Sequence, residues 1–455
     1  MMTLAEIARA VGGRLSGDDR TVTGVSTDTR TLAPGDVFVA LKGPRFDGHG
    51  FLAEAAKRGA LAALTDRPRE GDWPACVVVA DTRIALMRLA AYWRERIDPL
   101  VIAVTGSNGK TTVKDMTAGI LACTGPGIAT EGNRNNDIGL PLTLLRLRAH
   151  HRYAVVEIGM NHPGEIATLA ALARPDVAIV TNAGAAHLEG LGSVRAVAEE
   201  KGRIYGALTE QGVAVVNADD DFAAYWRAHA PGRVVSYGLT HPADVTATVR
   251  LTPEGSDCAF HLPGTPQPLD VRLAFLGRHN VLNALAAASA ALACDIPAPT
   301  IAEGLAAVRP PPGRMAATVG ADGIRIIDDT YNANPDSARA ALAVLASLPG
   351  ERWFVLGDMA ELGANAAELH GELGVQARDA GIDHLWTVGA LAAHASRSYG
   401  KRGRHYDDLE ALLRDLRPSL RPGAVVLVKG SRCMRMEQVV AGLTECGGRH
   451  APTVA

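Results

Sequence analysis

One short segment constrains the fold more than any other feature of the chain. The apolar run Leu100–Val104 leads directly into Thr105–Thr112, which reads TGSNGKTT, and a helical pattern follows. Glycines in such a loop let backbone N–H groups surround a phosphate chain, and the next helix N-terminus favours negative charge. A strand, this loop and a helix in that order predict a parallel α/β sheet that binds a nucleotide phosphate. The expected contacts are Thr105, Gly106, Ser107, Asn108, Gly109, Lys110, Thr111 and Thr112.

The loop is a variant of the general Walker pattern, because Val104 stands where that pattern has its first glycine. Lys110 is expected to reach the β- and γ-phosphates, and the Thr111 hydroxyl is expected to bind Mg²⁺. The alternative is a glycine-rich turn that carries a surface lysine. The loop indicates ATP use but does not say what happens to the γ-phosphate, since motors, kinases, GTPases and ligases share it.

Strand patterns alternate with helical patterns on both sides of this loop, which predicts mostly parallel sheets covered by helices. Pro310–Gly313 is the clearest linker, because three consecutive prolines cannot continue a helix. The fold class expected is therefore α/β with three domains: a small N-terminal α/β unit, a central P-loop sheet and a smaller doubly wound, Rossmann-like C-terminal unit. Their expected bounds are 1–82, 83–312 and 313–455. Strand-like runs between Val245 and Phe275 predict a small antiparallel extension.

Composition argues against several classes of protein. The formal net charge is −3 and no basic run is present, so nucleic acid is not expected as a partner. The six cysteines lack a C-x-x-C pair, which favours free thiols in a reducing compartment. The N-terminal MMTLAEI lacks the basic and apolar parts of a signal peptide, and the apolar stretch Val281–Cys294 is too short to span a bilayer. We expect a cytoplasmic monomer that acts on small molecules without membrane insertion.

The loop Thr105–Thr112 resembles that of the Mur ligase family, which shares its architecture with the folylpolyglutamate synthases. These enzymes phosphorylate a carboxylate with ATP and then let an amine attack the acyl phosphate. Further segments fit the family in the same order and extend the resemblance over nearly the whole chain. They are Glu157–Ile166, Thr181–Glu189, Glu199–Ile204, Gly277–Ala284, Pro312–Met315 and Asp328–Pro335.

The resemblance implies a metal site made from three segments. Glu157 ends a strand, where ligands of parallel sheets bind, and would hold Mg²⁺; a capping acid before a turn is the alternative. His187 would bind a second Mg²⁺ beside the acyl phosphate. Lys201 matches a lysine that CO₂ often carbamylates into a metal ligand, although its charged neighbours alone suggest an exposed helix face. Relatives commonly have an acid where this chain has Arg203.

Other matching positions imply contacts to the nucleotide. The Asn280 amide, which offers both a donor and an acceptor, would read adenine, although an ordinary helix start is the alternative. Arg314 would approach the γ-phosphate when the third domain closes. Asp329 would contact the ribose, while Tyr331 and Asn334 would lie at the interdomain cleft; good turn chemistry explains the same residues.

Within the family, four stretches resemble the branch that adds D-alanyl-D-alanine to UDP-N-acetylmuramoyl tripeptide. They are Asn133–Thr143, Tyr331–Ser337, Leu356–Gly363 and Lys429–Glu437. The sequence contains no Asp-Asn-Pro-Arg, the signature of the enzyme that adds diaminopimelate. Asp358, Glu361 and Lys429 are the candidates for handling the dipeptide. The third residue of the tripeptide, diaminopimelate or lysine, stays open.

The N-terminal stretches Ser26–Arg30 and Gly43–His49 resemble the domain that holds the UDP-sugar. Folylpolyglutamate synthases lack this domain. The candidates for contacts to the UDP-linked substrate are Ser26, Asp28, Arg30, Lys42, Asn133, Asn135 and Asn136. Plain surface charge is the alternative for Arg30 and Lys42. The rival functions are another Mur-type amino-acid ligase, a P-loop ATP hydrolase or switch, and an inactive nucleotide-binding scaffold.

Overall fold

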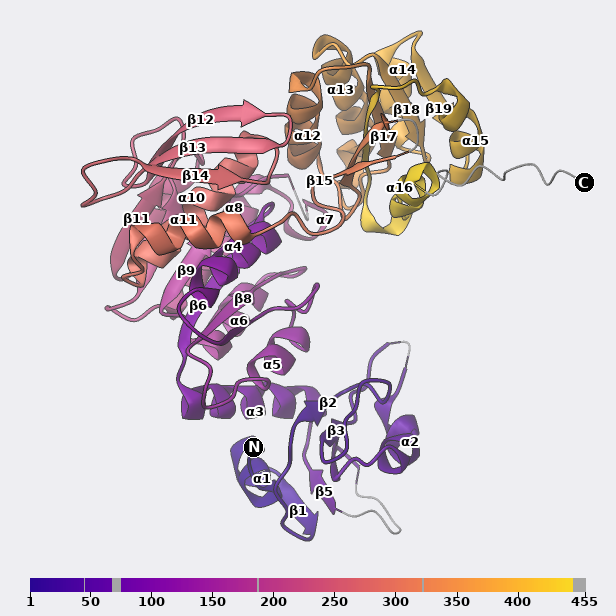
Figure 1. Ribbon diagram of the computed structural model, residues 1–455. Helices are drawn as coiled ribbons and strands as arrows, with labels where there is room; N and C mark the ends of the chain where they lie inside the picture. Colours follow the sequence, from indigo (N-terminus) through magenta and orange to yellow (C-terminus); the bar gives the residue numbers. More distant parts are fainter. Residues whose placement is uncertain (45, 68–74, 186–187, 321–322, 445–455) are drawn as a thin grey trace, which may run out of the picture.

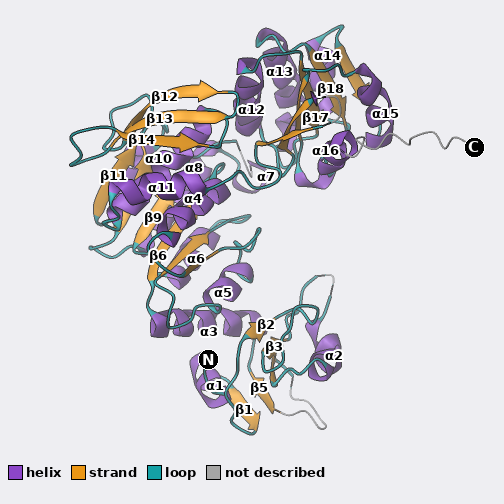
Figure 2. Ribbon diagram, viewed as in Figure 1, coloured by secondary structure: helices purple, strands orange, loops and turns teal. Residues whose placement is uncertain are grey.

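The chain forms three successive sheets covered by helices, with a small three-stranded sheet beside the second (Figure 1). The computed structural model describes residues 1–455 except 45, 68–74, 186–187, 321–322 and 445–455. Figure 2 shows strands and helices alternating along most of the chain. This arrangement confirms the expected α/β class. The positions of the sheets agree with three units, whose domain bounds stay a prediction.

The first sheet has the strand order β1-β5-β4-β3-β2, and β1 alone runs antiparallel to its neighbour. Its strands are β1 (Arg14–Gly17), β2 (Val25–Ser26), β3 (Val37–Val39), β4 (Ala62–Thr65) and β5 (Ala75–Val78). Its helices are α1 (Leu4–Val11), the 3₁₀ turn η1 (Gly48–Phe51) and α2 (Leu52–Lys57). A Thr3–Glu6 capping box begins α1.

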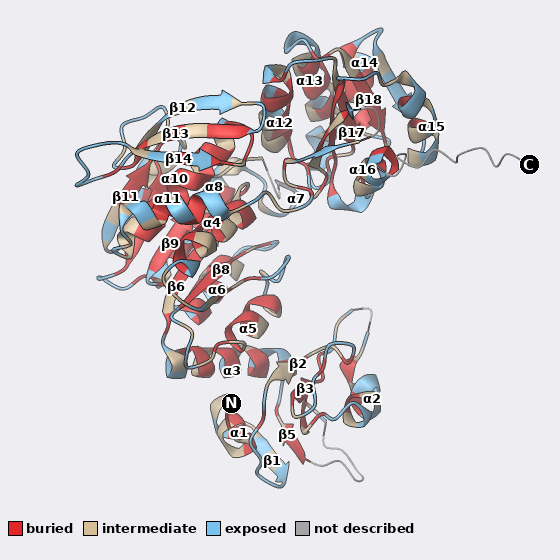
Figure 3. Cartoon of the chain, in the orientation of Figure 1, coloured by how far each residue is buried: buried red, intermediate tan, exposed pale blue. Residues whose placement is uncertain are grey.

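The second sheet is parallel throughout, in the order β11-β10-β9-β6-β8-β7. Its strands are β6 (Leu100–Thr105), β7 (Gly127–Ala129), β8 (Tyr153–Glu157), β9 (Val177–Val180), β10 (Val213–Asn217) and β11 (Arg233–Tyr237). The antiparallel extension is present as β12 (Thr246–Thr252), β13 (Gly255–His261) and β14 (Leu269–Leu273). Because helices cover both faces of the parallel sheet, its strands read as continuous apolar runs and lie buried (Figure 3).

Helices cover both faces of this sheet. One face carries α4 (Lys110–Ala122), α10 (Arg278–Ala293) and α11 (Ala298–Ala307). The remaining helices are α3 (Thr82–Ile97), α5 (Gly139–Leu144), α6 (Glu165–Ala173), α7 (Leu188–Leu191), α8 (Val194–Gly202), η2 (Arg203–Ala207) and α9 (Ala223–His229). The apolar side chains of α3 belong to one buried cluster that contains residues of both the first and the second sheet. This helix therefore joins the two sheets through a shared core.

The third sheet has the order β15-β16-β20-β17-β18-β19. Its strands are β15 (Ala316–Val319), β16 (Arg325–Asp329), β17 (Arg352–Gly357), β18 (His384–Val388), β19 (Gly403–Tyr406) and β20 (Val425–Lys429). The sequence analysis missed both edge strands, of which β15 is antiparallel to β16. The helices are α12 (Pro335–Ser347), η4 (Gly363–Asn365), α13 (Ala366–Asp379), α14 (Ala392–Tyr399), α15 (Leu409–Ser419), η5 (Arg432–Met434) and α16 (Glu437–Thr444). Separate apolar clusters fill its two faces.

The sequence analysis expected no membrane-spanning segment and no disulfide framework. None of the helices in the described ranges is long and apolar enough to cross a membrane. Cys123, Cys258, Cys294 and Cys433 form no disulfide within the described residues, and Cys446 lies outside them.

Candidate active site

A cavity of about 1090 Å³ lies between the second and third sheets. The phosphate loop forms part of its wall, and the segments that follow β8, β9 and β16 form other parts. Because the carboxyl ends of parallel strands meet at one edge of a sheet, the loops that follow them converge here. The cavity therefore combines residues that lie more than two hundred positions apart in the sequence.

The phosphate loop has the backbone geometry that its glycines predict. Gly106 and Gly109 have φ angles of +152° and +83°. A Cβ on Gly106 would lie 1.8 Å from Thr181 Oγ1, and one on Gly109 would lie 2.4 Å from Asn283 Oδ1, so only glycine fits. Helix α4 begins after Gly109 without a side-chain cap. Its first N–H groups therefore remain available for an anion at the cavity wall.

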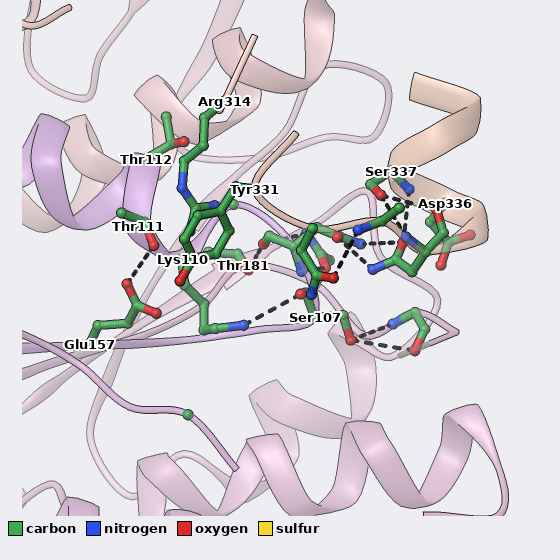
Figure 4. A pocket seen from close by; sticks show the side chains of 18 of the residues that line it. Ser107, Lys110, Thr111, Thr112, Glu157, Thr181, Arg314, Tyr331, Asp336 and Ser337 are labelled. Atoms are coloured by element: carbon green, nitrogen blue, oxygen red, sulfur yellow. Dashed lines mark hydrogen bonds between the residues drawn. The ribbon is translucent and has the colours of Figure 1, made fainter. Parts of the chain in front are cut away.

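Lys110 opens α4 and folds back over the loop. Its Nζ donates to the Gly106 carbonyl at 2.6 Å and to the Ser107 carbonyl at 3.4 Å (Figure 4). Burial lowers the pKa of Lys110, and the nearby Arg314 cation lowers it further, while Glu157 opposes the shift. Both cations thus border the same space, which suits an anion such as a triphosphate. Ser107 to Thr112 line the cavity, whereas Thr105 is fully buried in the strand end and supports the loop from behind.

Thr111 and Glu157 meet beside the loop. Thr111 Oγ1 donates to Glu157 Oε2 at 2.7 Å, and Asn135 Nδ2 donates to Glu157 Oε1 at 2.7 Å. The Glu157 main-chain N–H donates to Thr130 Oγ1, which fixes the strand end. A hydroxyl and a carboxylate in contact are the hard oxygen donors that Mg²⁺ prefers, so these residues fit that ion. No cluster of three His, Cys, Asp or Glu suited to a metal occurs among the described residues.

The loop after β9 supports the phosphate loop. The Asn108 N–H donates to Asn182 Oδ1 at 2.9 Å, and the Asn182 carbonyl accepts from the Ser107 N–H. Sequence analysis gave Asn182 no role of its own within the segment Thr181–Glu189; its position directly after a buried strand was the available signal. His187, predicted to be a metal ligand, lies outside the described residues.

Lys201 is buried, although the composition of its surroundings predicts exposure. The charged stretch around it predicts an exposed face, yet the structure buries Lys201 to 1% exposure at the cavity wall. Burial lowers its pKa well below the usual value, and Lys110 adds to the shift while Glu200 opposes it. Glu200 is also buried and accepts the Gly164 and Ile166 N–H groups. Arg203, which pairs with Glu200, is the exposed member of this stretch.

Asn280 and His279 lie at the start of α10 and line the cavity. Asn280 is buried, its Nδ2 donates to the Leu276 carbonyl, and its Oδ1 accepts from Asn283. The adenine-reading role of Asn280 stays a prediction. Sequence analysis missed His279, whose pKa falls to about 4 because of burial and, to a smaller extent, the Lys429 charge. Its place next to Asn280 in the same helix turn was the only sequence signal.

The third sheet contributes a cation and an ion pair to the cavity. The Arg314 guanidinium lies 4.0 Å from the centre of the Tyr331 ring, a cation–π arrangement that orients it (Figure 4). Lys429 Nζ donates to Asp329 Oδ2 at 2.6 Å and to the Asn332 carbonyl at 2.9 Å. Burial raises the pKa of Asp329, and Lys429 partly offsets that shift. The pair is thus held inside the protein at the cavity wall.

The dipeptide candidates do not all reach the cavity. Glu361 and Lys429 line it, but Asp358 is absent from the described residues that do. Asp358 Oδ1 instead accepts the Leu391 and Ala392 N–H groups at 3.0 and 2.7 Å. Those N–H groups belong to the start of α14, so Asp358 caps that helix, and the substrate contact expected of it stays a prediction.

Most of the UDP-sugar candidates lie outside this cavity. Asn135 and Asn136 line it, whereas the other described candidates do not. Those others are Ser26, Asp28, Arg30, Lys42 and Asn133. Arg30 forms a two-pronged hydrogen-bonded pair with Asp28, and its side chain is 83% exposed. The pair lowers the pKa of Asp28 to about 2. The structure thus brings the ATP candidates together, whereas four of these residues lie in the unit of the first sheet and Asn133 lies in the loop after β7.

A parallel sheet with a phosphate loop, a carboxylate beside its threonine and an arginine from a further domain define a multidomain enzyme that uses a nucleoside triphosphate. Family models described as Mur ligase family catalytic domain, Mur ligase middle domain and Mur ligase glutamate ligase domain match residues 21–94, 104–291 and 313–432. The chain belongs to the Mur ligase family and is an ATP-dependent amide-forming ligase.

Relatives match this chain from end to end. It is 44% identical to UDP-N-acetylmuramoyl-tripeptide–D-alanyl-D-alanine ligase of Escherichia coli (strain K12), over 98% of this chain and 99% of that one. It is 36% identical to the protein of the same name from Bacillus subtilis (strain 168), with 97% and 98% covered. The crystal structure of MurF from Acinetobacter baumannii superposes with a TM-score of 0.91 at 39% identity, covering 98% of this chain and 99% of that one. MurF from Thermotoga maritima, solved with ADP, gives 0.82 at 29% identity, with 93% and 97% covered.

Proposed function

We propose that this chain joins the terminal carboxylate of UDP-N-acetylmuramoyl tripeptide to the amine of D-alanyl-D-alanine, at the expense of ATP. The observation that carries the proposal is the cavity in which Lys110 and Arg314, from different sheets, border the same space. The full-length relatives with this name support the choice of substrates. The product is the UDP-linked pentapeptide used in peptidoglycan synthesis.

The first step transfers the γ-phosphoryl group to the substrate carboxylate. The carboxylate oxygen attacks phosphorus, the bond from phosphorus to the β-phosphate oxygen breaks, and ADP leaves. Negative charge spreads over the transferring group, so Lys110 and Arg314 stabilise the transition state more than the ground state. Thr111 and Glu157 would hold Mg²⁺, which would neutralise phosphate charge when bound. His187 and a carbamylated Lys201 remain proposed ligands of a second ion.

The second step forms the amide. The neutral amine of D-alanyl-D-alanine attacks the acyl carbon, a tetrahedral intermediate forms, and inorganic phosphate leaves with the former carboxylate oxygen. Water in the same position would hydrolyse the acyl phosphate, so the cavity must exclude it during the reaction. Both Glu361 and Lys429 line the cavity, which supports their proposed contacts to the dipeptide.

The compartment, the oligomeric state and the metal ion are part of the same proposal. We propose that the protein works in the cytoplasm as a monomer, with Mg²⁺. Cys123, Cys258, Cys294 and Cys433, which form no disulfide, support a reducing compartment. Sedimentation equilibrium tests the monomer, and metal titration of EDTA-treated protein tests the ion.

The test of the main proposal is a complete reaction with single omissions. Purified protein is incubated with ATP, Mg²⁺, UDP-N-acetylmuramoyl tripeptide and D-alanyl-D-alanine, and products are identified by mass spectrometry. A pentapeptide product that requires every component supports the proposal. ADP release without a new amide would favour an ATP hydrolase or a different amino substrate. Parallel reactions with diaminopimelate-containing and lysine-containing tripeptides settle the third residue.

A further inference from the structure

The first turn of α12 lies against the phosphate loop. Asn334 Nδ2 donates to Asn108 Oδ1 at 2.8 Å, and Asn108 Nδ2 donates to Asn334 Oδ1 at 3.4 Å. The two side-chain amides therefore face each other, donor to acceptor in both directions. Asn334 is buried, and its Oδ1 also accepts the Ser337 N–H at 2.9 Å as the N-cap of α12. This second bond holds the Asn334 amide in one orientation.

The backbone of Asn108 is held from the opposite side. Its carbonyl accepts from Thr181 Oγ1 at 2.5 Å and from Asn182 Nδ2 at 3.1 Å, and its N–H donates to Asn182 Oδ1. The phosphate loop thus keeps its shape through bonds within the second sheet. The Asn108 side chain takes no part in these bonds and contacts Asn334 of the third unit instead. The pair therefore helps to fix the position of the third sheet relative to the phosphate loop.

A second contact attaches the same helix turn to the second unit. Asp336 Oδ2 accepts the Ala185 N–H at 2.8 Å, in the loop that follows β9. A Cβ on Gly184 would lie 2.2 Å from the same oxygen, so a larger residue there would displace the Asp336 carboxylate. Figure 4 shows Asp336 and Ser337 on this turn beside the cavity. The start of α12 is therefore attached at two points to loops that shape the phosphate site.

We propose that Asn334 is a positioning residue whose amide pair with Asn108 holds the third sheet over the phosphate loop, so that Arg314 and Tyr331 stay at the nucleotide. The sequence placed Asn334 at the interdomain cleft, and this proposal gives it a role there. The inference rests on the proposed function for its activity readout. It predicts that losing the pair lowers turnover while the phosphate loop still binds ATP.

The test uses Asn334→Ser and Asn108→Ala, singly and together. Serine still caps α12 but is too short to reach Asn108, and alanine at 108 leaves the loop's backbone bonds in place. Each single variant should lower kcat for amide formation roughly tenfold, the effect of two neutral hydrogen bonds. In Asn334→Ser, ATP affinity measured with a fluorescent ATP analogue should change less than about twofold. The double variant should turn over no more slowly than the slower single variant.

The matched control is Asp408→Ser, another N-cap change in the same domain, at α15. It should keep wild-type turnover. Losses that multiply in the double variant, unchanged turnover in Asn334→Ser, or a loss explained by a lower melting temperature would each overturn the proposal.

A readout independent of activity separates this inference from the proposed function. Small-angle X-ray scattering with the non-hydrolysable analogue AMP-PNP should show a smaller radius of gyration for the wild type than for Asn334→Ser. Equal radii would refute the positioning role. If the wild type formed no pentapeptide but the radii differed, the proposed function would fail while the positioning role stood.

Discussion

The two ends of the expected active site differ in how the chain builds them. At the ATP end, Lys110, Thr111, Glu157 and Arg314 line one cavity, although they come from two sheets. At the UDP-sugar end, Arg30 and Lys42 lie on the first sheet and outside that cavity. The ATP end depends on a loop whose covalent spacing sets most of its geometry. The UDP end lacks such a loop and depends on how the first sheet is placed against the others.

The largest expected effect is at the ATP end. Lys110→Ala should lower turnover by about 10³-fold, because it removes a cation from a site where charge spreads in the transition state. Amide formation and ADP release, measured together, should fall in parallel, while the melting temperature stays near the wild-type value. A variant with near-full activity would show that the phosphate loop is not the ATP site.

The next largest effect is expected at Lys201, whose proposed carbamylation can be tested. Burial lowers its pKa, which favours the uncharged amine that reacts with CO₂. Removing CO₂ should lower wild-type activity about tenfold and bicarbonate should restore it, whereas Lys201→Arg should be inactive and unresponsive. Since acid protonates the amine, the carbamate and the activity should both decline as pH falls through the lowered pKa. Carbon-13 NMR with labelled bicarbonate detects the carbamate directly; its absence in an active enzyme would rule out the modification.

A smaller effect is expected at the UDP end. Arg30→Ala should raise KM for the UDP-linked tripeptide about threefold, because an 83%-exposed guanidinium contributes little to any single interaction. KM for ATP should not change. Arg402→Ala, an exposed arginine on the third domain, is the matched control. An equal rise in both KM values would contradict a separate UDP end and place Arg30 in a role common to both substrates.

The smallest catalytic effect is expected at Asp358, which belongs to neither end. Asp358→Ala should lower the free energy of unfolding by about 1 kcal/mol, because the first N–H groups of α14 lose their acceptor. KM for D-alanyl-D-alanine should stay unchanged. Denaturant unfolding and steady-state kinetics on the same sample measure both quantities. A large rise in that KM with unchanged stability would restore the substrate role that the sequence suggested.

The sequence predicted the parts of the site that follow from local rules. The loop at 105–112 was recognisable because glycines, lysine and threonine at fixed spacing between a strand and a helix have few other uses. Glu157 was recognisable because it ends an apolar strand, and such ends collect at one edge of a parallel sheet. The α/β class followed from alternating strand and helix patterns, although the edge strands β15 and β19 were missed. Both edge strands have only four residues and no buried position, so their patterns are weaker.

Lys201 and Asp358 show where local reasoning reached its limit. The charged stretch around Lys201 has the composition of a surface helix, and only the packing of α8 against the cavity buries it. Asp358 has the type of side chain that binds an amine, and only the position of α14 turns it into a cap. In both cases the outcome depends on which distant element packs against the residue, and that information is absent from a short window of sequence.

By itself, the sequence determined the layered α/β architecture, the phosphate loop and, through resemblance, the family, because each depends on residue type and spacing along the chain. Tertiary structure alone decided that Arg314 meets Lys110, that Asn334 pairs with Asn108, and that the residues of the first sheet lie outside the shared cavity. These relations join residues of different sheets. Their distances are set by core packing between helices and strands, which fixes the sheets' relative positions only once the whole chain has folded.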